Sequence, residues 1–109
     1  MIILPDIISP GLEILFVGFN PSLRSAEIGH HFAGANNRFW KVMYMSNITS
    51  LQLNTENDQR LLEYSCGLTN IVERPTKSAA EITKKEYLAG AYILREKIKK
   101  NQPLQSCVM

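Results

Sequence analysis

Cysteine and histidine are scarce in this sequence, with two of each among 109 residues. Cys66 and Cys107 form no CxxC pair, which excludes a disulfide framework and a zinc site built on cysteines. We expect both to be reduced thiols of a cytoplasmic protein. His30 and His31 are adjacent, so they point in different directions, and no third ligand is near them. We therefore expect no metal and no cofactor.

The sequence also lacks the segments and motifs of several other protein classes. No apolar run is long enough to cross a membrane, and the N-terminus has neither the basic flank nor the long apolar core of a signal peptide. The phosphate-binding patterns GxGxxG and GxxxxGK[ST] are both missing. The net charge of +2, from 12 basic and 10 acidic residues, is only a weak indication of a nucleic-acid partner.

What is present fits one α/β domain spanning residues 1–109. Short apolar runs bounded by turns predict strands, and apolar residues at helical spacing predict helices. The expected elements are strands at 13–17 and 68–72, helices at 38–45, 55–64 and 84–100, and a third strand from residue 104. This alternation predicts a three-layer α/β/α sandwich with a mainly parallel central sheet.

Polar residues in capping positions place the starts of these helices. Thr83 and Glu86 make a capping box, as do Thr55 and Asp58, the latter with Asp in the reciprocal position. Asn36 or Asn37 is expected to cap the helix at 38–45. Behind the box at Thr83, one helical stripe is expected to face the sheet. It consists of Tyr87, Ala91, Leu94 and Ile98.

Two polar turns follow the first two strands directly. Gly18 ends the first strand and Asn20-Pro21-Ser22 turns the chain, while residues 73–76 form a turn after the second strand. Ligands of open α/β sheets sit beyond the carboxyl ends of the strands, so we expect the two turns to lie side by side at a site. A loop that carries Phe32 follows the first turn.

The residues of this region leave two interpretations open. Asn before Pro is common turn chemistry, but an amide, which does not titrate near neutral pH, can also orient a water molecule. Water positioning suffices where the leaving group departs readily, as in N-glycosidic cleavage of uracil. Phe32 is equally compatible with a core position and with stacking on a base.

Two motifs carry a resemblance to a known family. GFNPSLRSAEIGHHFAGANNRFWK at residues 18–41 and CGLTNIVERPT at residues 66–76 resemble the mismatch-specific uracil/thymine-DNA glycosylases, a branch of the uracil-DNA glycosylase superfamily. The resemblance implies a monomeric DNA-repair hydrolase. It would cleave the N-glycosidic bond of uracil or thymine mispaired with guanine in double-stranded DNA, at G·U or G·T pairs, and so initiate base excision repair.

The resemblance also implies roles for single residues. Asn20 is the catalytic residue, which positions the attacking water, and Phe32 stacks on the flipped base. The residues expected to bind the substrate base are Gly18, Phe19, Ser25, Phe32 and Asn70. Independently of the resemblance, the residue types of Arg74 and Lys77 suit phosphate contacts with DNA, and His31 is expected either to contact DNA or to lie in a solvated loop. Phe19 and Ser22 depart from the family pattern, which has an aliphatic residue and a glycine at these places.

Family members continue past the position where this sequence stops. They carry a second motif, Asn-Pro-Ser-Gly with a small apolar wedge, where residues 104–109 have none. We expect a C-terminally incomplete glycosylase-like domain without its last strands, nearly inactive on duplex DNA, with residual activity first on single-stranded uracil DNA. The alternatives are a truncated, inactive paralogue and a small nucleotide-binding α/β module. Two measurements separate the enzyme from the module. Excision of the base from a uracil-containing duplex indicates the enzyme, and binding of free nucleotides indicates the module.

Overall fold

The computed structural model describes residues 4–33 and 38–108. The elements are β1 (Ile14–Gly18), α1 (Leu23–Ile28), α2 (Phe39–Met45), η1 (Thr55–Tyr64), β2 (Cys66–Asn70), η2 (Ala79–Glu81), α3 (Lys84–Asn101) and β3 (Gln105–Val108), where η denotes a 3-10 helix. Asn36 and Asn37, the expected caps of α2, lie outside the described residues. Within those residues, no helix has the length and apolar character that crossing a membrane requires.

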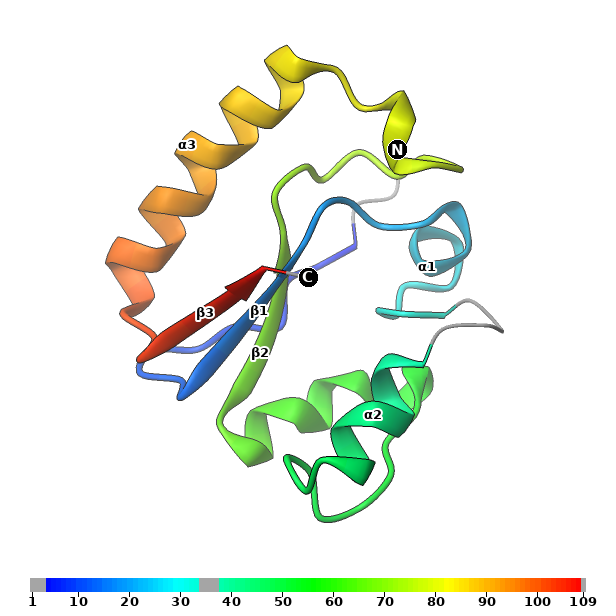
Figure 1. Ribbon diagram of the computed structural model, residues 1–109, viewed down its shortest axis with the longest axis vertical. Coiled ribbons are helices and arrows are strands. Elements are labelled where there is room, and N and C mark those ends of the chain that lie inside the picture. Colours follow the sequence, from blue (N-terminus) through cyan, green and yellow to red (C-terminus); the bar gives the residue numbers. More distant parts are fainter. Residues whose placement is uncertain (1–3, 34–37, 109) are drawn as a thin grey trace.

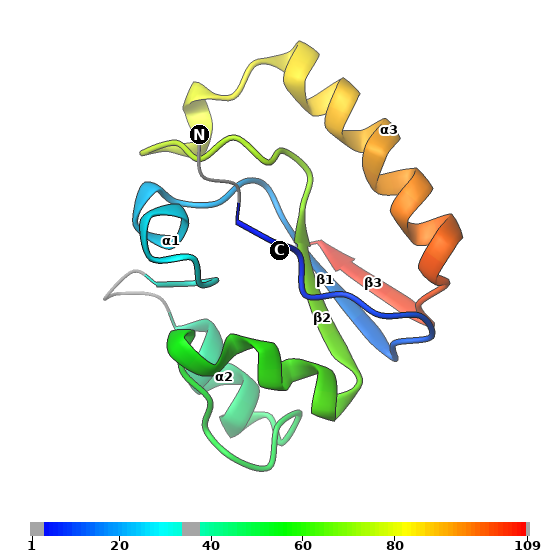
Figure 2. The same cartoon turned by 180° about the vertical axis from the view of Figure 1, so that it is seen from behind.

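The three strands form one parallel sheet in the order β2-β1-β3, with α3 on one side and α2 and η1 on the other (Figures 1 and 2). Ile14 at the start of β1 aligns with Cys66 and with Gln105. The predicted α/β class with a parallel sheet is confirmed. Ile7 of the N-terminal lead-in forms an antiparallel bridge with Leu68 and covers the outer edge of β2.

The central strand β1 contributes to a core on each face of the sheet. Successive side chains of a strand point to opposite faces. Phe16 therefore packs with Trp40 of α2 and Leu61 of η1, whereas Leu15 and Val17 pack on the face that α3 covers. Leu15 and Val17 have no exposed surface, and β1 is paired with a strand on each of its edges.

Helix α3 begins at the predicted capping box. The Thr83 hydroxyl accepts the backbone N–H of Glu86, and the Glu86 carboxylate accepts that of Thr83, both at 3.2 Å. Leu94 and Ile98 face the sheet as expected. Ala91 is exposed instead, and Gly90 is the buried residue of the helix.

Three local predictions were wrong. Residues 23–28, expected as loop, form α1, because the Ser22 hydroxyl caps its start and Gly29 takes the left-handed conformation at its end. Strand β2 lies two residues earlier than predicted and includes Gly67. The cap of η1 is Asn54 with Asn57 as its reciprocal partner, one residue before the predicted box. This shift leaves the side chains of Thr55 and Asp58 available for other contacts.

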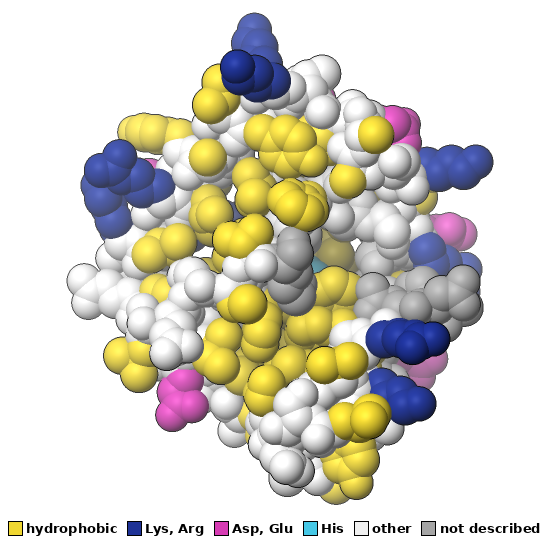
Figure 3. All heavy atoms as spheres, in the orientation of Figure 1, with side chains coloured by type: hydrophobic (Ala, Val, Ile, Leu, Met, Phe, Trp, Pro, Cys, Tyr) yellow, Lys and Arg dark blue, Asp and Glu magenta, His cyan; other side chains and the backbone are white. Residues whose placement is uncertain are grey.

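Strand β3 is exposed along its whole length. In the view of Figure 1, in which β3 is visible, apolar side chains gather over the middle of the molecule, between α3 and α2 (Figure 3). Leu104 and Val108 are among the exposed large apolar residues, as are Leu88 and Tyr92 of α3. Both cysteines are free; burial raises the pKa of the Cys66 thiol, and Cys107 is exposed on β3.

Candidate active site

A cavity of about 280 Å³ lies beyond the carboxyl ends of β1 and β2. The residues that line it are Gly18, Phe19, Asn20, Pro21, Ser22, Phe32, Asn70, Thr76, Lys77 and Ala79. The two turns expected to be neighbours do lie side by side, since Ser22 and Thr76 form a parallel bridge and Thr76 donates its N–H to the Pro21 carbonyl at 3.3 Å. The position of the site relative to the sheet is therefore the predicted one.

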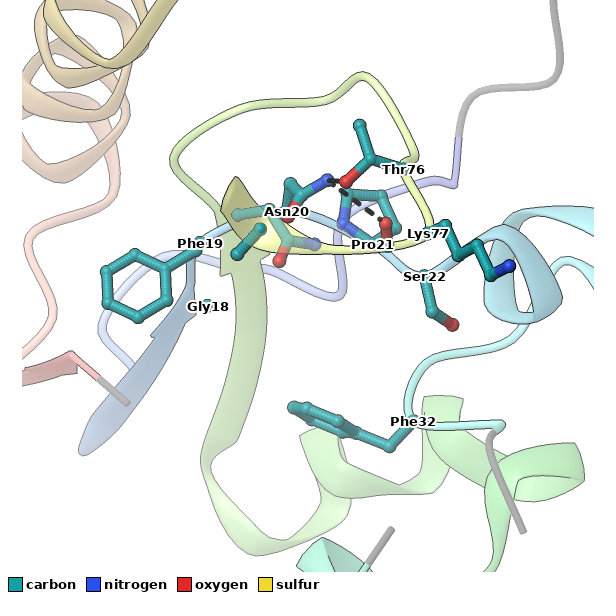
Figure 4. A pocket seen from close by; sticks show the side chains of 10 residues that line it. Gly18, Phe19, Asn20, Pro21, Ser22, Phe32, Thr76 and Lys77 are labelled. Carbon is teal, nitrogen blue, oxygen red and sulfur yellow. Dashed lines mark hydrogen bonds between the residues drawn. The ribbon is translucent and has the colours of Figure 1, made fainter. Parts of the chain in front are cut away.

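The amide group of Asn20 is held in one orientation. Its nitrogen Nδ2 donates to the Arg74 carbonyl at 2.9 Å. The same nitrogen donates to the Thr76 hydroxyl at 2.8 Å, a bond drawn in Figure 4. The Thr76 hydroxyl donates its own proton to the Ser78 carbonyl at 2.7 Å, so toward Asn20 it can only accept. Both amide hydrogens are thus engaged by the protein. No residue within the described ranges donates to the amide oxygen, which can therefore accept a hydrogen bond from a water molecule.

Gly18 and Asn70 touch where the two strands end. A Cβ atom on Gly18 would lie 2.6 Å from the Asn70 side-chain oxygen, so any larger residue would displace that amide. The Gly18 carbonyl accepts the Ile71 N–H at 2.9 Å, and the Phe19 carbonyl accepts the Val72 N–H at 2.9 Å. These bonds extend the pairing of β1 with β2 up to the rim of the cavity and fix the backbone before Asn20.

Phe32 lies across the cavity from Asn20 (Figure 4). Its ring stacks on Phe39 with a centroid distance of 4.2 Å and an interplanar angle of 22°, and meets Trp40 edge-on at 6.2 Å. The residue both packs against the core and lines the cavity, so the two interpretations of Phe32 do not exclude each other. An aromatic face next to an apolar cavity is suited to stacking on a planar base.

Phe19 lines the cavity, whereas Ser25, another predicted base contact, does not. The Phe19 ring is 47% exposed and meets Tyr87 of α3 edge-on at 6.3 Å, pointing away from the cavity (Figure 4). Its bulk therefore leaves the cavity open, and its backbone forms the wall. Ser25 is buried, and its hydroxyl accepts the Ala33 N–H and the Ser22 hydroxyl, each at 3.1 Å, so it stabilises the loop.

His31 also departs from its predicted role as a DNA contact. Its side chain is only 4% exposed, and Nε2 lies 2.7 Å from the Pro5 carbonyl. Because a carbonyl only accepts, Nε2 carries the proton. Burial lowers the pKa of His31, which favours the neutral ring. The neighbouring His30 is the more exposed ring and bonds through Nδ1 to Asp58 at 3.2 Å.

Of the two cations predicted to contact phosphates, Arg74 has a partner within the protein. Its guanidinium binds both carboxylate oxygens of Glu86, at 2.9 and 3.0 Å, and donates to the Glu81 carbonyl at 3.1 Å. This fork joins the turn after β2 to the start of α3 and fixes the carbonyl that holds Asn20. Lys77 lies exposed on the wall of the cavity, where a phosphate contact stays a prediction.

A comparison with known families agrees with this geometry. A family model described as the uracil DNA glycosylase superfamily matches residues 5–109. The chain belongs to this superfamily. Its members are hydrolytic glycosylases that act on DNA, so the superfamily assigns uracil-DNA glycosylase-type DNA repair. Among the described residues, no group of three or more His, Cys, Asp and Glu side chains is placed to hold a metal ion.

Two residues near the glycosylase site escaped prediction from the sequence. Thr76 was the last residue of the second motif, but nothing in the sequence shows that its hydroxyl binds the Asn20 amide. Asp58 was expected to cap its own helix, yet it is 2% exposed and bonds to the loop before Phe32. A buried carboxylate is unusual enough to mark such a position in a structure, but burial is not visible in one sequence.

The Arg74 fork predicts an acid dependence of stability. Hydrogen bonds from Arg74 lower the pKa of Glu86 from 4.5 to about 2. Glu86 therefore binds its proton more tightly in the unfolded chain than in the folded protein. The stability that its ion pair with Arg74 contributes is fully present above pH 4.5 and is lost as the pH falls toward 2. We expect the melting temperature of Glu86→Gln to fall less than that of the wild type between pH 5 and pH 3. Equal falls in thermal melts at the two pH values would contradict this.

Proposed function

We propose that this chain hydrolyses the N-glycosidic bond of uracil, or thymine, mispaired with guanine in double-stranded DNA, and so initiates base excision repair. The observation that carries the proposal is the fixed Asn20 amide, whose oxygen accepts from no residue in the described part of the chain and which lines the same cavity as the Phe32 ring. The motifs around these two residues are those that resemble the mismatch-specific branch. Lys77 on the cavity wall would contact a phosphate and position the strand.

The chemistry requires little from an acid or a base. The flipped base stacks on Phe32, and a water molecule bound to the Asn20 oxygen attacks the sugar carbon C1′. The C1′–N1 bond breaks and its electron pair leaves with the base as a delocalised anion, while the water contributes hydroxide to the sugar and releases a proton to solvent. The base anion then takes up a proton from solvent. Asn20 acts by positioning, because its amide does not titrate.

The test is base release from labelled oligonucleotides that contain G·U, G·T or A·U pairs, and from single-stranded uracil DNA, with enzyme in excess. We expect release from the single strand to be fastest, because no base has to leave a duplex. Among the duplexes, G·U should exceed A·U. Equal release from G·U and A·U would leave a glycosylase without mismatch specificity. No release, together with binding of free nucleotides, would favour the nucleotide-binding module.

A further inference from the structure

Asp58 is a buried carboxylate outside the two motifs, and it is bonded to the loop that carries Phe32. Its Oδ2 accepts the backbone N–H of His31 at 2.7 Å, and its Oδ1 lies 3.2 Å from His30 Nδ1. Burying a carboxylate is costly unless it is paired and hydrogen-bonded. Here both oxygens are used, and both bind residues immediately before Phe32.

Thr55, one turn earlier in η1, holds the other side of the same residue. Its hydroxyl donates to the His31 carbonyl at 2.8 Å. The peptide groups on both sides of His31 are therefore fixed by one helix, and the His31 ring is fixed separately by the Pro5 carbonyl. These contacts exist because η1 is capped by Asn54, which leaves Thr55 and Asp58 free to face the loop.

The residue that follows has an unfavourable backbone. Phe32 has φ of 53°, in the left-handed region, which is unfavourable for a residue with a Cβ atom. Such conformations persist where the surroundings determine them, and they concentrate at functional sites. The conformation sets one ring face on Phe39 and leaves the ring on the wall of the cavity.

We propose that Asp58, together with Thr55, is the positioning residue of the base-stacking ring: it fixes the His31 peptide so that Phe32 meets the flipped base in the left-handed conformation. The inference rests on the proposed function, since it needs a base in the cavity. It assigns to η1, which does not line the cavity among the described residues, the control of how well a base is held there.

The test compares binding to two duplexes of the same sequence, so that it does not depend on catalysis. One carries 2′-fluoro-2′-deoxyuridine opposite guanine, which resists cleavage, and the other a tetrahydrofuran abasic residue at the same place. Only the first offers a base to Phe32. Relative to Glu63→Ala, which loses the same charge, Asp58→Ala should weaken binding to the fluorouridine duplex by about tenfold, the order expected when a base loses its aromatic partner, and should leave binding to the abasic duplex unchanged.

Matched variants separate this role from charge and from folding. Glu63→Ala removes a carboxylate from the same helix, at an exposed pair with Arg60, and so corrects for the stronger DNA binding that a lost negative charge brings. Phe32→Ala sets the size of the full effect. Asp58→Asn keeps an oxygen for the His31 N–H and should restore most of the binding. If Asp58→Ala does not fold, the milder change Thr55→Val replaces it in the test. Thr55→Val should weaken binding to the fluorouridine duplex and leave binding to the abasic duplex unchanged.

Each outcome decides the matter. A selective loss for Asp58→Ala or Thr55→Val, with recovery in Asp58→Asn, supports the role. If the wild type binds both duplexes and the variants weaken both equally, or neither, then Asp58 only stabilises the fold and this inference alone fails. If the wild type does not distinguish the fluorouridine duplex from the abasic one, the base is not held in the cavity. The proposed function then fails as well.

Discussion

Asn20→Ala is expected to lower the single-turnover rate of uracil release by at least about a hundredfold, the loss that follows when a reacting group is misplaced by about an ångström. The variant removes the oxygen that would hold the attacking water and leaves the Phe32 ring in place. The measurement is release from single-stranded uracil DNA, where extrusion from a duplex plays no part. Binding to a duplex with an abasic residue should not change.

Thr76 provides the matched controls for that result. Thr76→Val keeps the volume of the side chain but removes the acceptor of the Asn20 amide, so the amide can turn and the rate should fall by an intermediate amount. Thr76→Ser retains the hydroxyl and should stay near the wild-type rate. A rate for Asn20→Ala close to that of the wild type would remove the residue from the mechanism, whatever the two threonine variants do.

Gly90→Ala should destabilise the fold strongly, although alanine is the better helix former by about 1 kcal/mol. A Cβ atom at Gly90 would overlap the Ile71 carbonyl oxygen and lie 2.9 Å from the Ile71 carbonyl carbon, both of them backbone atoms just beyond β2. Helix α3 must then move away from the sheet. We expect a loss of about 3 kcal/mol in the free energy of unfolding, the upper range for overpacked cores, measured by urea denaturation.

The contrast within the same helix makes this prediction sharp. Ala89→Gly, at an exposed position next to Gly90, should lose at most about 1 kcal/mol, through helix propensity alone. Because Ile71 donates to the Gly18 carbonyl, a shift of α3 would also disturb the backbone before Asn20. Gly90→Ala more stable than the wild type would mean that the helix is not pressed against the strand end.

What the sequence predicted well was local or periodic. The apolar run that begins at Ile14 forms the predicted strand, and Thr83 and Glu86 form the predicted capping box. The two polar turns lie side by side because parallel strands end at the same edge of the sheet. The short helix α1 was missed because six residues carry too little periodicity. Ser22 and Gly29, which bound it, are also common in loops.

The rest depends on partners far apart in the chain. Glu86 caps its helix as expected, and it also binds Arg74. Arg74, which was predicted to contact a phosphate, therefore holds the turn after β2 against the start of α3. The one-residue shift of the η1 cap changed the meaning of Asp58, from a residue bonded to its own helix to one bonded to His31. Propensity cannot distinguish such neighbouring registers, because Asn54 and Thr55 are both good caps.

The order of the strands has a kinetic consequence. The enclosed strand β1 pairs with residues 66–70 on one side and 105–108 on the other, so neither of its ladders can form from residues nearby in the chain. Folding is slow when long loops must close first, because their entropy cost comes before any contact stabilises the chain. Sheets of this kind refold over milliseconds to seconds rather than microseconds. During synthesis, Leu15 and Val17 leave the ribosome long before β3, the strand that completes their ladder. Until β3 has been made, the apolar strand β1 has one unpaired edge. That exposed edge is a binding site for a chaperone during synthesis.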